Sequence, residues 1–169
     1  MSEDRPSLFV AYANERYERS VTGRLKRKLA SRGIDLYRLI EDSRIGERWT
    51  QAAERKISEA DGVVVIWTKK ALKSRVVDEY RFARKIDKPI CLVREDNVPL
   101  PPDWPEDMVY APLRGLSPAF IILSRLVAGP SLVSSEDIEF NAMLDQITVF
   151  AWRQAALSAV RRAGLSHSS

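Results

Sequence analysis

Four short runs of hydrophobic residues punctuate the first two thirds of the chain, at residues 8–12, 34–39, 63–67 and 90–93. The third run, VVVIW, has no polar position, which is typical of a strand buried on both faces of a sheet. A weaker apolar run at residues 108–111 predicts a short fifth strand at an edge of that sheet.

The segments between the strands carry helical patterns, which predict helices at residues 21–32, 50–59 and 76–86, with a closing helix at residues 118–127. In the first helix, Val21, Leu25 and Leu29 recur at i, i+4 and i+8, and Ser20 is the expected N-cap. Strands and helices that alternate at these lengths indicate an α/β domain with a parallel sheet and right-handed crossovers.

After Gly129-Pro130 the pattern changes to one long helix that continues to about Ala163. We therefore divide the chain into a domain over residues 6–128 and a helical extension with a polar tail over residues 130–169. The helix either packs across the domain or binds a partner. Its expected apolar stripe consists of Met143, Ile147, Phe150 and Leu157.

Composition excludes several classes of function. The net charge of +4 comes from interspersed acids and bases, without a basic run between aromatics, so we expect no direct contact with nucleic acid. The single cysteine, Cys91, lies in a strand pattern and the single histidine, His167, in the polar tail. A disulfide framework, a metal site and a Ser-His triad are therefore not expected.

No segment of the chain reads as a membrane anchor. The N-terminus lacks the apolar core of a signal peptide, and the apolar run at residues 119–129 is too short to cross a bilayer. We expect a cytoplasmic protein that does not contact a membrane.

One carboxylate stands out as a candidate for chemistry. Glu79 falls in the first turn of the helix that follows the strand at residues 63–67, near the sheet edge where open α/β folds bind ligands. The alternative is a solvated glutamate, which a helix N-terminus also favours. Asp78 is the rival carboxylate.

A set of motifs now identifies a family. In chain order they are Phe9-Val10-Ala11-Tyr12, Gly46-x-x-Trp49, Ile57-x-x-Ala60-Asp61, residues 63–68, Glu79-x-x-x-Ala83 within residues 74–83, and Lys88-Pro89-Ile90. Their order and spacing resemble a Toll/interleukin-1 receptor (TIR) domain of the bacterial type. The resemblance implies a flavodoxin-like three-layer sandwich with a mainly parallel five-stranded sheet, to which this chain adds its C-terminal helical extension.

The chain departs from the family pattern at three positions. Arg75 stands where the family usually has an aromatic residue, four positions before the glutamate. Leu39 stands where an aspartate usually ends the second strand, and Ala11 replaces a serine of the first. These departures concern the catalytic inference more than the fold.

TIR domains fall into two functional classes, and the resemblance implies one of them. Some cleave NAD+, releasing nicotinamide and leaving ADP-ribose or a cyclic ADP-ribose, whereas others are non-catalytic adaptors that act through TIR–TIR interactions. We expect an NAD+ glycohydrolase activated by self-association, with NAD+ as substrate and no cofactor or metal. Bacterial members serve in anti-phage defence or virulence. A nucleoside deoxyribosyltransferase, which also uses a glutamate, is a further alternative.

The resemblance also assigns roles to residues. Glu79 is the expected catalytic residue, since a carboxylate beside the ribose stabilises the positive charge that develops as nicotinamide leaves. Tyr12, Gly46, Trp49 and Arg75 are the expected substrate-binding residues. Their alternatives are a rim tyrosine, a glycine needed for the loop backbone, a tryptophan packed under that loop and a surface arginine.

Overall fold

The computed structural model describes residues 5–39, 48–105, 111–113 and 135–165. Its parallel strands stand in the order β2-β1-β3-β4-β5. Their bounds are Ser7–Ala11 (β1), Asp35–Tyr37 (β2), Gly62–Trp67 (β3), Ile90–Arg94 (β4) and, as a two-residue strand, Ala111–Pro112 (β5). The α/β class and the parallel sheet expected from the sequence are confirmed.

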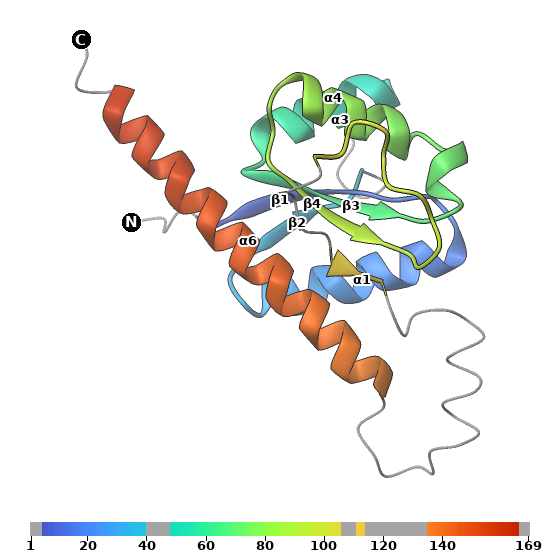
Figure 1. Cartoon of the computed structure of the whole chain (residues 1–169). Coiled ribbons are helices and arrows are strands. Elements are labelled where there is room, and N and C mark those ends of the chain that lie inside the picture. Colours follow the sequence, from blue (N-terminus) through green and yellow to red (C-terminus); the bar gives the residue numbers. More distant parts are fainter. Residues whose placement is uncertain (1–4, 40–47, 106–110, 114–134, 166–169) are drawn as a thin grey trace.

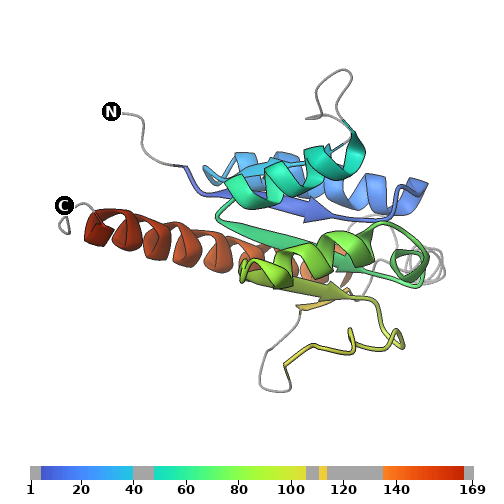
Figure 2. The same cartoon turned by 90° about the horizontal axis from the view of Figure 1, so that it is seen from above.

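Helices cover both faces of this sheet, which makes three layers (Figures 1 and 2). Their bounds are Arg16–Ala30 (α1), Trp49–Glu59 (α3), Val76–Lys85 (α4) and Ser135–Leu165 (α6), with a 3-10 turn at Ala71–Lys73 (η1). Helices α3 and α4 lie on one face, and α1 and α6 pack on the other. None of the described helices is both long and apolar enough to span a membrane.

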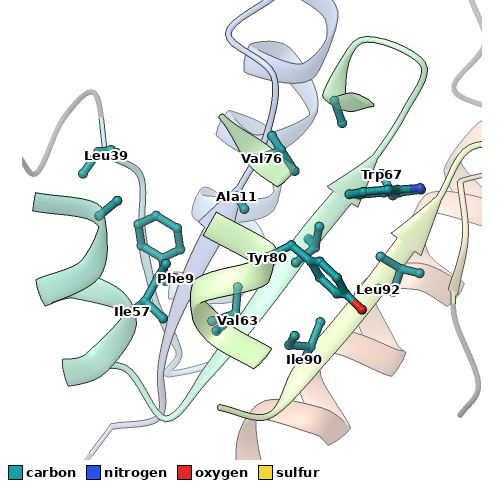
Figure 3. Close-up of a cluster of buried hydrophobic side chains, with 14 of the residues drawn as sticks. Phe9, Ala11, Leu39, Ile57, Val63, Trp67, Val76, Tyr80, Ile90 and Leu92 are labelled. Atoms are coloured by element: carbon teal, nitrogen blue, oxygen red, sulfur yellow. The ribbon is translucent and has the colours of Figure 1, made fainter. Parts of the chain in front are cut away.

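Strand β3 lies at the centre, and all of its residues are buried. Its side chains alternate between two hydrophobic clusters. Val63 and Val65 face α3 and α4, where they meet Ile57 and Tyr80, whereas Val64 and Ile66 face α1 and α6. Figure 3 shows the first of these clusters.

Helix α1 starts before Ser20, so the expected N-cap at Ser20 was wrong. The helix begins at Arg16, and the side chain of the N-cap residue Glu15 makes no capping hydrogen bond. Tertiary packing sets the start instead, because Glu18 is 3% exposed and continues the buried stripe of Val21 and Leu25 by one turn.

The first half of α6 is part of the hydrophobic core. Phe140, Met143, Leu144 and Ile147 are all buried in the cluster under the sheet, together with Ala151. A Cβ placed on Gly62 would lie 2.7 Å from the ring of Phe150, so the close approach of α6 to β3 requires glycine there.

The sequence left open whether this helix packs across the domain or binds a partner, and its first half packs on the sheet. Met143 and Ile147 follow the expected stripe, but Leu157 is 42% exposed. Two ion pairs also fasten the first half of α6 to α1, between Arg24 and Asp137 and between Arg32 and Asp145 at 2.6 Å. The expected closing helix at residues 118–127 and most of the strand at residues 108–111 lie outside the described residues.

Truncation of Ile147 to alanine tests whether α6 belongs to the folding unit. We expect Ile147→Ala to lower the free energy of unfolding by about 2–4 kcal/mol, because it leaves a cavity under the sheet. Gln146→Ala is the matched control, since Gln146 is exposed on the same helix and should change stability by less than about 0.5 kcal/mol. Urea denaturation followed by circular dichroism measures both. Equal effects of the two variants would show that α6 is a separate appendage.

Candidate active site

The site lies at the carboxyl edge of the sheet, where the chain order reverses. Strands β1 and β3 are neighbours, yet the helices that follow them, α1 and α4, pack on opposite faces. Such a switch point leaves a crevice outside the strand ends, and open α/β folds bind ligands there. Tyr12 directly follows β1 and Thr68 directly follows β3 at this edge.

A cleft of about 190 Å³ opens between α3 and α4. Trp49 and Thr50 come from the start of α3, whereas Arg75, Asp78 and Glu79 come from the start of α4. Ala53, Glu54, Ile57 and Phe82 complete its wall. The cleft thus combines an apolar floor with a few charged groups, as small-ligand sites do.

A second, narrower space of about 20 Å³ continues from the same residues toward β1. Its lining consists of Val10, Tyr12, Asn14, Leu39, Trp49 and Glu79. Because Trp49 and Glu79 line both spaces, Glu79 stands where the two meet.

Hydrogen bonds in the loop between β3 and α4 hold Glu79 in this position. The Thr68 hydroxyl donates to the Glu18 carboxylate (3.0 Å) and accepts from the backbone N–H of Ala71 (3.2 Å). The Ser74 hydroxyl donates to the Ala71 carbonyl (2.9 Å) and accepts from the N–H of Val76 (3.3 Å). The start of α4 is thereby tied to α1 and to the end of β3.

The carboxyl group of Glu79 is buried at the junction of the two spaces. Its side chain is 9% exposed, and desolvation raises its pKa from 4.5 to about 8. Arg75 opposes this rise and Asp78 adds to it, both through their charges. Glu54 and Tyr12 are the other ionisable groups that line the two spaces. A buried carboxyl group with a perturbed pKa in a cleft is typical of a functional site.

Asp78 differs from its neighbour in every respect. Its side chain is 74% exposed and lies 4.0 Å from Arg81 in a surface ion pair. It lines the mouth of the cleft, whereas Glu79 lies at the bottom. The choice of Glu79 over Asp78 therefore agrees with the geometry.

An arginine and a tryptophan meet at the cleft. The guanidinium carbon of Arg75 lies 5.6 Å from the centroid of the Trp49 ring, within cation–π distance. Tyr12 lies on the other side, with Arg38 5.5 Å from its ring centroid. The Tyr12 hydroxyl is buried and has no hydrogen-bond partner among the described residues, so a polar ligand group would satisfy it.

The structure thus brings together Tyr12, Trp49, Arg75 and Glu79, four of the five residues selected from the sequence. The fifth, Gly46, lies outside the described residues. The residues that sequence reasoning missed are Asn14, Leu39, Glu54 and Phe82 in the lining, and Glu18 beneath it.

Other residues near this edge of the sheet do not line the cleft. Trp67 is buried at the end of β3, and its indole N–H donates to the carbonyl of Pro99 (2.8 Å). Lys69, Lys70 and Lys73 are exposed and do not line the cleft. No group of three or more His, Cys, Asp or Glu side chains able to hold a metal ion occurs in the described part of the chain.

The chain belongs to the TIR domain family, since the family model matches residues 8–125. This membership also removes the deoxyribosyltransferase alternative. No curated protein matches the chain.

Solved structures similar to this chain include two with TIR domains. One is the TIR domain of the Toll-related receptor TRR-2 from Hydra magnipapillata, at 19% identity, with a TM-score of 0.49 over 69% of this chain and 92% of that one. Another comprises the TIR domains of the activated Roq1 resistosome, at 15% identity and a TM-score of 0.48 over 85% and 83%. A conserved protein from Enterococcus faecalis V583 has 16% identity and a TM-score of 0.46 over 54% of this chain, which spans 65% of that protein.

The raised pKa of Glu79 predicts a specific dependence of stability on pH. Between pH 4.5 and about 8 the folded state holds a proton on Glu79 that the unfolded state has lost. Glu79 therefore stabilises the fold fully below pH 4.5, and this contribution is lost as the pH rises toward 8. We expect Glu79→Gln, which stays neutral, to gain stability relative to wild type by on the order of 3 kcal/mol between pH 5 and pH 9.

Urea denaturation at each pH measures this difference. The matched control is Asp78→Asn, which removes only an exposed charge with the smallest effect on the pKa of Glu79 and should change the pH profile far less than Glu79→Gln does. A constant difference between Glu79→Gln and wild type across this range would mean that the Glu79 carboxyl group is not desolvated.

Proposed function

We propose that this TIR domain is an NAD+ glycohydrolase in which Glu79 is the catalytic residue. The observation that carries the proposal is the position of Glu79, a buried carboxyl group at the junction of two spaces at the switch point of the sheet. Trp49 and Arg75, on either side of the cleft, offer an aromatic face and a cation to a dinucleotide.

The proposed reaction needs one carboxylate and no general acid. The bond between the ribose C1′ and the nicotinamide nitrogen breaks, and both electrons leave with nicotinamide, which departs as a neutral molecule. Positive charge develops on the ribose, and a carboxylate beside the sugar stabilises that charge. Water then adds to C1′ and loses a proton, giving ADP-ribose. Attack by a nitrogen of the adenine ring in place of water gives a cyclic product.

The protonation state of Glu79 couples binding to catalysis. In the empty cleft its pKa of about 8 keeps most of the group neutral at pH 7. A bound pyridinium ring carries a positive charge, which lowers the pKa of an adjacent carboxyl group. Substrate binding therefore creates the carboxylate that the reaction needs, and a neutral ligand does not.

Trp49 and Arg75 divide the recognition of the substrate in this proposal. Trp49 is half-buried and lines both spaces, which supports a role for its ring in stacking on the nicotinamide, in place of the aromatic residue that Arg75 replaces in the family pattern. Arg75 is exposed at the mouth, where it suits the pyrophosphate. Tyr12 offers its unpaired hydroxyl to the ribose.

Self-association is the second component of the proposal. We infer that NAD+ cleavage rises with protein concentration, as expected of a TIR domain that acts in an assembly. The competing function is a non-catalytic adaptor that uses the same TIR–TIR contacts, and it needs neither a buried Glu79 nor an open cleft.

Replacement of Glu79 tests the catalytic role. We expect Glu79→Gln to lower the rate of nicotinamide release from NAD+ by at least about 100-fold, because the neutral amide cannot stabilise the charge on the ribose. Asp78→Asn should stay within about threefold of wild type. Chromatography of the products after incubation at high protein concentration measures both variants and separates ADP-ribose from a cyclic product.

No nicotinamide release by the wild-type chain, even when it is held at high density on a surface, would favour the adaptor. Cleavage that survives in Glu79→Gln but disappears in Asp78→Asn would move the catalytic role to the neighbouring carboxylate.

Replacement of Trp49 tests the stacking role. We expect Trp49→Ala to raise the KM for NAD+ by about tenfold, since the loss of one aromatic stacking partner weakens binding by on the order of 1–2 kcal/mol. Trp49→Phe keeps an aromatic face and should restore most of the affinity. Steady-state kinetics at several NAD+ concentrations measures both, and equal KM values for the alanine and phenylalanine variants would contradict the stacking role.

A further inference from the structure

Helix α6 is apolar on two sides, and the sheet covers one of them. Phe140, Met143, Leu144 and Ile147 are buried under the sheet. On the other side Ile138, Val149 and Val160 are 61%, 68% and 69% exposed, and Trp152 is 49% exposed. A helix with apolar residues on two opposite sides is typical of an element buried between two bodies.

The exposed side has the spacing of a helix-pairing seam. Eight positions from Ile138 to Ala163 follow one another at alternating steps of four and three residues, and all eight are exposed. We call this line of residues the outer stripe. Six of its members are Ile138, Asp145, Val149, Trp152, Ala156 and Ala163. Alternating steps of four and three keep one line of side chains facing a second helix along its whole length.

The outer stripe also runs past the domain. The helix has 31 residues, so it is roughly 46 Å long, and its C-terminal half projects beyond the ends of the strands (Figures 1 and 2). In the projecting half, Trp152, Ala156 and Ala163 lie on the outer stripe and the exposed Val160 lies beside it, whereas Ser158, on the opposite side, is polar and half-exposed. Projection with one apolar line supplies a surface for a second helix of similar length.

We propose that the outer stripe pairs with the same stripe of a second copy of this chain, with the two helices antiparallel. The stripe is symmetric about the midpoint between Phe150 and Ala151, so a twofold axis there sets each of its positions opposite another of its positions. Under that symmetry Ile138 faces Ala163 of the second copy and Val149 faces Trp152. A large residue thus meets a small one at each end of the pair, and the large side chains of Val149 and Trp152 meet at its centre.

Charge selects the antiparallel arrangement over the parallel one. Asp145 is the one acidic member of the stripe; it pairs with Arg32 of its own α1 and would face Ala156 of the second copy. Arg153 flanks Ala156 at one turn's distance and is exposed, so antiparallel pairing adds a second cation beside the Asp145–Arg32 pair. A parallel pair in register would instead set Asp145 against Asp145, which is unfavourable. Antiparallel helices also oppose their dipoles favourably.

The pairing does not depend on the proposed NAD+ cleavage. Helix α6 packs on the sheet face that α1 also covers, whereas the cleft lies between α3 and α4 on the other face. Failure of one proposal therefore leaves the other standing.

Sedimentation equilibrium of the full chain tests the pairing. We expect wild type to sediment at twice the chain mass, and the double variant Val149→Asp/Ala156→Asp, which changes two members of the outer stripe, to raise the dissociation constant at least 100-fold. Ser158→Asp, on the opposite side of the helix, is the matched control and should sediment as wild type. Circular dichroism confirms that each variant remains folded, since all three positions are at least partly exposed.

Cysteine cross-linking in a Cys91→Ala background tests the direction of the helices. Antiparallel pairing predicts a disulfide when Ile138→Cys and Ala163→Cys proteins are mixed, and none in either protein alone. A disulfide in Ile138→Cys alone would overturn the antiparallel arrangement. A wild-type chain that stays at single mass up to millimolar concentration would overturn the pairing itself, as would sedimentation of that monomer with phosphatidylserine vesicles, which would make the stripe a membrane surface.

Discussion

A strand that is apolar on both faces must be covered on both faces, and β3 imposes this requirement on the whole molecule. Every residue from Gly62 to Trp67 is buried. Helices α3 and α4 satisfy one face, but α1 alone leaves the other incomplete. The first half of α6 fills that gap with Phe140 and Ile147. The first half of the C-terminal helix is therefore part of the domain's core. Its projecting half continues an element that the fold already requires.

The candidate site is an exception to this apolar interior, because it buries a carboxyl group. Burial of Glu79 removes its carboxyl group from water, which destabilises the charged form and raises its pKa. The loop before α4 keeps its position because it is held by hydrogen bonds that do not involve Glu79. They run from Thr68 to Glu18 and from Ser74 to Ala71. A carboxyl group that is fixed in place but poorly solvated is suited to stabilise a positive charge that arrives with a substrate. The residue that weakens the fold at neutral pH is thus the residue best prepared for chemistry.

Local sequence patterns predicted the strands and helices well, but they predicted poorly where a helix begins and what it packs against. The continuous run VVVIW predicted a doubly buried strand, and the spacing of Val21, Leu25 and Leu29 predicted the buried face of α1. Comparison with the motifs of the family selected Trp49, Arg75 and Glu79 from the sequence, and the three residues line one cleft in the structure. Glu18 was missed because a charged residue at the start of a stripe reads as solvated, although its position three residues before Val21 placed it on the buried side. The predicted start of α1 was wrong, and the packing of α6 was left open, because both depend on contacts with distant strands, which no window of sequence contains.

The two proposals meet in the arrangement of the faces. Pairing through the outer stripe puts the α6 helices of two chains between their sheets, so the α3–α4 faces of both copies point outward. The clefts with Glu79 then remain open to substrate, and neither copy closes the site of the other. The pair alone therefore gives no reason for Glu79 to become active. If assembly does switch on NAD+ cleavage, the switch must act through contacts at the cleft edge, where α3 begins at Trp49 directly after the segment that contains Gly46. Pairing would raise the local concentration of those edges and so favour the contacts among them without forming any itself.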